Sequence, residues 1–170
     1  MVYITGDTHG DFARIASFCK KMQTTPEDIM IILGDAALNY FADERDVQRK
    51  KYVSKLPVTF FCIHGNHEAR PDHIASYQTH PFQGGKVFCE TEYPSLLFGI
   101  DGEAYDFDGL SCMVIGGAYS VDKYYRLMRG YQWFPDEQPS YEIKERVESK
   151  ISAMGGRVDI VLSHTCPLKY

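Results

Sequence analysis

Short apolar runs alternate with helix-like stretches in the first half of this 170-residue chain. Three of the runs have the length and composition of buried strands: Val2–Thr5, 29–33 and 58–63. Between them, residues 11–23 place apolar side chains on one helical face, with Asp11 as a helix cap. Residues 43–56 are charged and helix-forming, and Pro57 ends that helix. This β-α-β-α-β order predicts parallel strands joined by crossover helices.

The helical period is lost between residues 86 and 117. Glycines separate four short apolar runs there, which predict antiparallel strands and hairpins: 87–89, 95–100, Ala104–Phe107 and 112–115. A helix over 141–154, closed by two glycines, and a buried strand over 158–162 complete the expected elements. With no internal repeat or linker in the sequence, we expect residues 1–170 to form a single domain.

Composition and charge narrow the classes of protein that fit. Hydrophobic residues make up 44% of the chain and charged residues 24%, which suits one globular domain and argues against disorder. The net charge of −5, without a basic block, argues against a nucleic-acid partner. No apolar run approaches the ~20 residues of a membrane span, so no membrane partner is expected. The chain start lacks signal-peptide features and the five cysteines are widely spaced, which predicts reduced thiols and a cytoplasmic protein.

Polar residues follow each of the four buried strands. They are Asp7 and His9 after the first, Asp35 after the second, Asn66 and His67 after the third, and His164 after the last. Each group alone also fits an ordinary turn, a helix cap or a surface histidine. Ligand-binding residues, however, collect beyond the carboxyl ends of parallel strands, so we expect all four groups to meet at one edge. Carboxylates, imidazoles and an amide oxygen together suit a divalent transition metal such as Mn, Fe or Zn.

The motifs Asp-x-His, Gly-Asp and Gly-Asn-His-Glu, followed by an isolated histidine after a strand, resemble the signature of the calcineurin-like metallophosphoesterase superfamily. The resemblance covers residues 3–167, including the Gly-Gly-Ala-Tyr-Ser stretch that begins at Gly116. It implies an α/β fold, a β-sandwich of two mixed sheets flanked by helices in four layers, α/β/β/α.

The resemblance also implies what each motif residue does. It implies five metal ligands: Asp7 and His9 for a first ion, Asn66 and His164 for a second, and Asp35 bridging both. His67 is then the catalytic residue that donates to the phosphate or to the leaving oxygen. The implied reaction is hydrolysis of a phosphoester by in-line attack of a hydroxide held at two divalent ions, Mn before Fe or Zn. The substrate class stays open among small molecules, nucleotides and phosphoproteins, and so does the oligomeric state.

The sequence departs from the family pattern after His164, where a Gly-His-x-His motif is expected and absent. We interpret the domain as truncated after the His164 motif, lacking its C-terminal part. Two alternatives stay open. Another chain supplies the missing ligands, or the protein is a metal-poor, non-catalytic member of the fold that binds a phosphorylated ligand or a partner.

Several other residues are interpreted as structural. The Asp-Arg-Gly of related phosphoprotein phosphatases is missing after Asp35. Arg126 and Arg129 could replace its phosphate clamp, but a solvated basic turn beside surface tyrosines is the favoured interpretation. We expect His64 to have a structural role and Cys166 to be a packed thiol.

Overall fold

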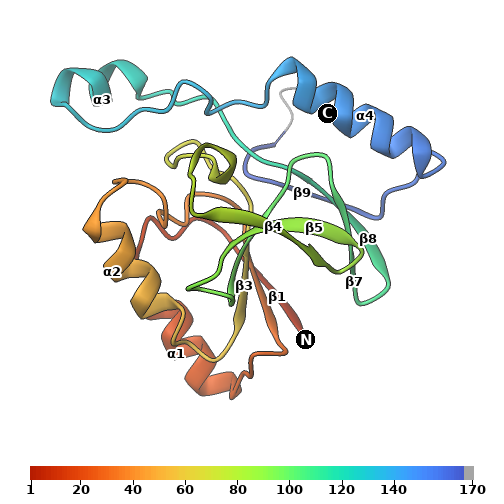
Figure 1. Ribbon diagram of the computed structural model, residues 1–170, viewed down its shortest axis with the longest axis horizontal. Coiled ribbons are helices and arrows are strands. Elements are labelled where there is room, and N and C mark those ends of the chain that lie inside the picture. The colour runs from red at the N-terminus through yellow and green to blue at the C-terminus, as the bar shows by residue number, and fades with distance from the viewer. Residues whose placement is uncertain (167–170) are drawn as a thin grey trace.

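The computed structural model describes residues 1–166 as two packed β-sheets with helices on the outside (Figure 1). Residues 167–170, where the predicted domain ends, lie outside the described residues. The larger sheet has the order β1-β2-β3-β6-β5-β4, formed by β1 (Val2–Thr5), β2 (Ile29–Ile32), β3 (Thr59–Cys62), β6 (Leu96–Gly99), β5 (Gly85–Glu90) and β4 (Tyr77–Phe82). The smaller sheet has the order β7-β8-β9, formed by β7 (Ala104–Phe107), β8 (Leu110–Ile115) and β9 (Ile160–Ser163). Both sheets are mixed, which confirms the predicted α/β sandwich.

The first three strands run parallel, as their alternation with helices predicts. Tyr3 of β1 lies opposite Met30 of β2, and Met30 lies opposite Phe60 of β3. The hairpins β4–β5 and β7–β8 are antiparallel, which confirms the expectation for the middle of the chain. Strand β4 was not expected, because its sequence contains His80 and Pro81. An edge strand tolerates proline, since its outer N–H groups need no partner in the sheet.

The last strand lies in the other sheet from the one its sequence pattern suggests. Strand β9 pairs in parallel with β8 of the smaller sheet, with Leu162 opposite Val114, rather than joining β1, β2 and β3. The four polar groups therefore do not follow four neighbouring strands of one sheet, because the fourth group follows a strand of the smaller sheet. A buried apolar run identifies a strand, but it does not say which sheet completes it.

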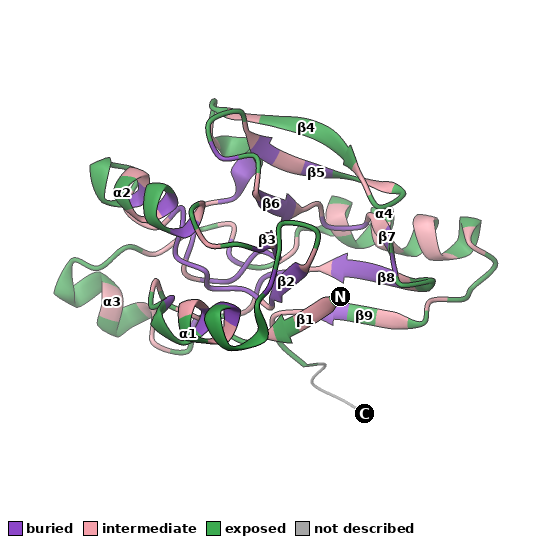
Figure 2. Ribbon diagram, turned by 90° about the horizontal axis from the view of Figure 1, so that it is seen from below, coloured by how far each residue is buried: buried purple, intermediate pink, exposed green. Residues whose placement is uncertain are grey.

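Side chains that alternate along the larger sheet form two separate cores. Met30, Ile32, Phe60 and Cys62 are buried on the face covered by the helices. Ile31 and Phe61, one residue along, are buried on the opposite face, against side chains of β7, β8 and β9. Figure 2 shows this buried centre between the outer helices and the smaller sheet. Both faces of the central strands are covered, which is why they read as continuous apolar runs.

The helices differ in how much they contribute to these cores. Helices α1 (Ala13–Met22) and α2 (Glu44–Val53) each bury side chains against the larger sheet, whereas α3 (Lys123–Arg129) and α4 (Tyr141–Ala153) bury none. The Asp11 carboxylate accepts a hydrogen bond from the Ala13 N–H, but the N-cap of α1 is Phe12, so Asp11 lies one residue before the cap position and the prediction that it caps the helix is wrong. Helix α4 lies beside the smaller sheet, on the side away from α1 and α2 (Figure 1).

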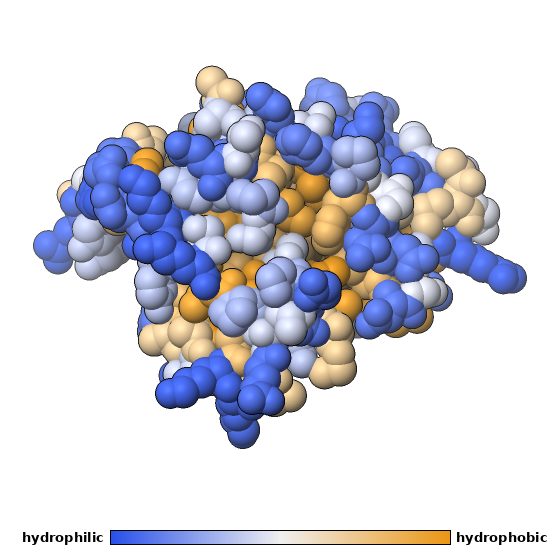
Figure 3. Space-filling model, turned by 60° about the horizontal axis from the view of Figure 1, so that its bottom comes forward, coloured by the Kyte–Doolittle hydropathy of each residue, from blue (hydrophilic) through white to orange (hydrophobic). Residues whose placement is uncertain are grey.

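The surface mixes polar side chains with apolar ones that reach solvent. On the face shown in Figure 3, apolar atoms are visible between polar groups. Edge strands β1 and β9 each expose one apolar side chain, Ile4 and Val161. Within residues 1–166, no helix has the length and apolar character needed to cross a membrane.

Candidate metal centre

The loops that follow β1 and β2 are tied together by backbone hydrogen bonds. The N–H groups of Thr8 and His9 both donate to the Asp35 carbonyl, at 3.3 and 2.9 Å. His9 and Asp35 have φ values of +45° and +50°, in the left-handed region that residues other than glycine rarely adopt. Such a conformation costs roughly 1–2 kcal/mol per residue and is typical of functional sites. His9 and Asp35 are two of the five metal ligands that the family resemblance implies, and five other non-glycine residues within residues 1–166 share this conformation.

Asp35 is the centre of the cluster. Its side chain is buried, and the N–H of His67 donates to its Oδ1 at 2.9 Å. Its Oδ2 faces three imidazoles: His9 Nδ1 at 3.7 Å, His164 Nε2 at 3.7 Å and His67 Nε2 at 4.0 Å. These separations are too long for hydrogen bonds. They match the roughly 3–4 Å between two atoms that share one ion at ligand distances of about 2.0–2.2 Å.

Two glycines allow the loops to approach this closely. Gly34 has φ +91°, and a Cβ there would overlap the His164 ring. A Cβ on Gly65 would overlap both the carboxylate and the backbone nitrogen of Asp35. The glycines before Asp35 and Asn66 are therefore required for space at the site, and at Gly34 also for the turn.

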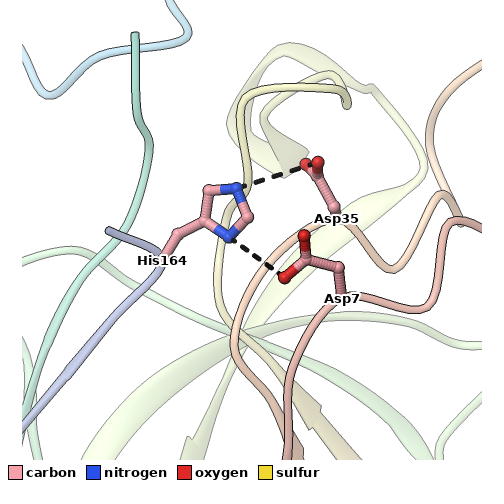
Figure 4. A group of neighbouring side chains, drawn as sticks. All are labelled: Asp7, Asp35 and His164. Carbon is pink, nitrogen blue, oxygen red and sulfur yellow. Dashed lines mark ion pairs between the residues drawn. The ribbon is translucent and has the colours of Figure 1, made fainter. Parts of the chain in front are cut away.

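His164 reaches the cluster from the smaller sheet, directly after β9. Figure 4 shows its ring between Asp7 and Asp35, with Nδ1 4.0 Å from Asp7 Oδ1. The same Nδ1 lies 2.7 Å from the Leu33 carbonyl, an acceptor, so Nδ1 carries a proton. In a neutral imidazole, Nε2 then presents a lone pair toward the cluster.

Asn66 directs an oxygen at that same lone pair. Its Nδ2 donates to the Ser120 hydroxyl at 2.8 Å, and this hydroxyl donates to the Glu137 carboxylate at 2.5 Å. With the amide oriented by this chain of hydrogen bonds, Oδ1 points at His164 Nε2, 2.8 Å away. Two lone pairs at this distance repel each other unless a proton or a cation lies between them.

The donor set therefore fits a divalent cation. Ligand atoms of Asp7, Asp35 and His164 all lie within 4.8 Å of one another, the one such group found within residues 1–166. His9 lies beside it, with Nε2 3.6 Å from Asp7 Oδ2. Carboxylate oxygens with imidazole nitrogens suit Mn²⁺, Fe and Zn²⁺, and this set of ligands does not discriminate among the three metals.

A cavity of about 420 Å³ opens beside this cluster. It is lined by His9, Ala37, Tyr40, Phe41, Arg49, His67, Asp122 and Arg126. His9 and His67, whose ring centres are 5.9 Å apart, border both the cavity and the cluster. Burial lowers the pKa of His67, although the charge of Asp35 acts in the opposite direction.

The structure corrects the interpretation of one of the two arginines. Arg126 is not in a solvated turn: its guanidinium donates to the Tyr40 hydroxyl at 3.0 Å and to the Gln132 carbonyl at 2.9 Å, and it lines the cavity. Arg129 is exposed, and its guanidinium lies over the Tyr125 ring. The seven-residue helix α3 turns one arginine inward and leaves the other in solvent.

Buried groups next to the cluster have perturbed acidities. Burial, with the nearby charge of Asp35, raises the pKa of Glu68 to about 8, and its Oε1 accepts a hydrogen bond from the Gly65 N–H. Burial also lowers the pKa of His64 well below its ordinary value. The His64 carbonyl accepts from the Gly117 N–H at 2.7 Å, which ties the end of β3 to the loop after β8.

The sequence pattern missed several residues at this site. Ser120 and Glu137 orient Asn66, and only the stretch after Gly116 hinted at the first of them. Arg49 and Tyr40 carry no motif signal, because they reach the cavity through the folding of α2 and its preceding loop. Cys166, expected to be packed, is exposed. It follows β9 at the end of the described residues and has no core to enter.

A comparison with protein families agrees with this arrangement. The family described as calcineurin-like phosphoesterase matches residues 1–169. Because the match spans nearly the whole chain, the chain belongs to this family. Family membership implies metal-dependent hydrolysis of phosphoesters. No curated protein matches the chain.

Proposed function

We propose that this protein is a phosphoester hydrolase that works with two divalent metal ions. The observation that carries the proposal is the convergence of three potential ligand atoms, Asp35 Oδ2, Asn66 Oδ1 and His164 Nε2. Ions held there supply an activated water and offset negative charge on the phosphate. Mn²⁺ is the first candidate, with Fe or Zn²⁺ as alternatives.

The position of each residue indicates its role in binding the ions or in the reaction. Asp7 and His9 belong to the first ion, Asn66 and His164 to the second, and the buried Asp35 bridges them. The N–H of His67 holds Asp35 in place, and its ring faces the cavity where the substrate enters. His67 is the residue that donates a hydrogen bond or proton to the phosphate or leaving oxygen.

The cavity and the cysteines support a proposal for the size of the substrate and for the cellular compartment. The cavity volume suits a small molecule or nucleotide, or one side chain of a phosphoprotein. The free cysteines, four of them buried among the described residues, support a reducing compartment, and we propose the cytoplasm.

The test is a manganese titration of protein freed of metal by a chelator. Hydrolysis of p-nitrophenyl phosphate and of its bis ester is measured for the wild type, Asp35→Asn and a matched surface variant, Asp72→Asn. We expect activity to rise with Mn²⁺, to fall on the order of a hundredfold in Asp35→Asn and to persist in Asp72→Asn. The ratio of the two substrates separates monoesterase from diesterase.

The opposite result has a definite meaning. Wild-type protein that binds one ion or none and hydrolyses neither ester contradicts the hydrolase proposal. The metal-poor member that binds a phosphorylated ligand without turnover then becomes the better account.

A further inference from the structure

One guanidinium in the cavity lacks a carboxylate partner. Arg49 of α2 is partly buried, and among residues 1–166 no carboxylate oxygen lies within 4.0 Å of it. One of its N–H groups donates to the Ala37 carbonyl, and its guanidinium carbon lies 5.6 Å from the centre of the Phe41 ring. A Cβ on Gly10 would overlap the guanidinium, so Arg49 lies directly over the loop that carries His9.

The other cavity arginine is already paired. Arg126 lies 3.4 Å from the carboxylate of Asp122, which also lines the cavity. The cavity thus has two guanidinium groups and one carboxylate, and the unpaired charge belongs to Arg49. Burial raises the pKa of the Asp46 carboxyl, on the same helix, and the charge of Arg49 acts in the opposite direction, but Asp46 forms no ion pair with Arg49 within 4.0 Å. A partly buried guanidinium without a direct ion-pair partner loses hydration that an anionic ligand can replace.

The position of the cavity indicates which part of the substrate carries the anion that binds Arg49. The cavity lining includes His9 and His67 but none of Asp7, Asp35, Asn66 or His164. The reacting phosphate belongs next to Asp35, so the cavity beyond His9 and His67 accommodates the rest of the substrate. Its volume of about 420 Å³ is in the range of small-molecule sites, and its aromatic side chains Tyr40 and Phe41 offer apolar contact.

We propose that Arg49 binds a second anionic group, a carboxylate or a second phosphate, on the non-reacting part of the substrate. The site then prefers phosphoesters that carry two separated anions. A planar guanidinium with free N–H groups binds either anion through paired hydrogen bonds. This inference rests on the proposed function for the position of the reacting phosphate.

A binding experiment tests the second anion without turnover. Benzylphosphonate and 3-(carboxymethyl)benzylphosphonate, which cannot be hydrolysed at phosphorus, are titrated into the protein with Mn²⁺ present, by calorimetry. We expect the wild type to bind the carboxymethyl compound about tenfold more tightly. Arg49→Gln should remove that difference, and Arg49→Lys should retain part of it because the charge remains.

Lys51→Gln is the matched control. It removes one positive charge from the same helix at an exposed position outside the cavity lining, so the tenfold preference should persist. Two results overturn the inference. Either the wild type binds both phosphonates equally, or Arg49→Gln weakens both to the same extent, which places Arg49 at the reacting phosphate.

A parallel measurement keeps the two proposals distinguishable. Phosphate release is followed from phenyl phosphate and 3-(carboxymethyl)phenyl phosphate with Mn²⁺. A binding preference without hydrolysis of either ester contradicts the hydrolase and leaves the Arg49 site standing. Hydrolysis of both esters at equal kcat/KM, with equal phosphonate binding, contradicts the Arg49 site alone.

Discussion

The two faces of the larger sheet are built from the same strands but pack against different parts of the molecule. On one face, Phe60 and its neighbours pack against α1 and α2 in an apolar core. On the other face, Phe61 packs against the rings of Tyr105 and Phe107 from the smaller sheet, at 4.8 and 5.2 Å between centroids. Both phenylalanines are fully buried, so the two faces are matched in burial.

The two cores differ in the elements that they hold in position. The helix face holds α1 and α2 in place, and apolar burial there contributes stability. The sheet face determines where β9 ends, and therefore where His164 meets Asp35 and Asn66. Packing between the sheets is thus a requirement for the proposed metal centre as well as for stability.

Substitution of the two phenylalanines tests this contrast most strongly. Phe60→Ala and Phe61→Ala should each lower the free energy of unfolding by about 3–5 kcal/mol, because each leaves a cavity in a full core. Only Phe61→Ala should also weaken Mn²⁺ binding of the folded protein, since it loosens the packing between the two sheets on which the position of β9 and His164 depends. Urea unfolding measures the stability, and calorimetry without denaturant measures the affinity. Equal Mn²⁺ affinity in the two variants would show that the faces do not differ in this way.

Ser120→Ala tests the role of a single hydrogen bond, the one that the Asn66 amide donates to the Ser120 hydroxyl. The Asn66 amide loses the acceptor that fixes its orientation, so Mn²⁺ affinity should fall about 10–100-fold with little change in melting temperature. Ser54→Ala, at the end of α2 on the helix face, is the control and should leave the affinity unchanged. A loss of the same size in both variants would argue against a specific role of Ser120.

The smallest effect concerns a carboxyl group on the helix face. Burial raises the pKa of Asp46 above 3.8, although its Oδ2 accepts from the Phe41 and Ala42 N–H groups. A raised pKa in the folded state means that the contribution of Asp46 to stability is complete below about pH 4 and is lost as pH rises through the folded pKa. Asp46→Asn stays neutral and keeps an acceptor oxygen. Relative to the wild type, its free energy of unfolding should therefore increase from about pH 3 to about pH 7, by a few tenths to about 1 kcal/mol.

Urea unfolding at both pH values measures that difference. A difference between variant and wild type that falls over this range would contradict the assigned sign. Mn²⁺ binding should be unchanged, because Asp46 lies on the face that does not position the proposed metal ligands.

Much of the fold could be predicted from local patterns. Apolar runs located β1, β2, β3 and β9, and helical spacing located α1, because burial imposes these periods on any sequence. Strand β4 and helix α3 were missed, because neither buries a continuous apolar face. Their formation depends on hydrogen bonds and neighbours supplied by other parts of the chain.

Short motifs at the strand ends were sufficient to predict which residues converge and to which family the chain belongs. Three features depend on how the whole chain packs. His164 comes from a second sheet, Glu137 orients Asn66 through Ser120, and Arg49 faces the cavity with no carboxylate within 4.0 Å in the described part of the chain. These contacts join residues far apart along the chain. Their geometry follows from how the two sheets and α2 pack, which no local pattern of residues specifies.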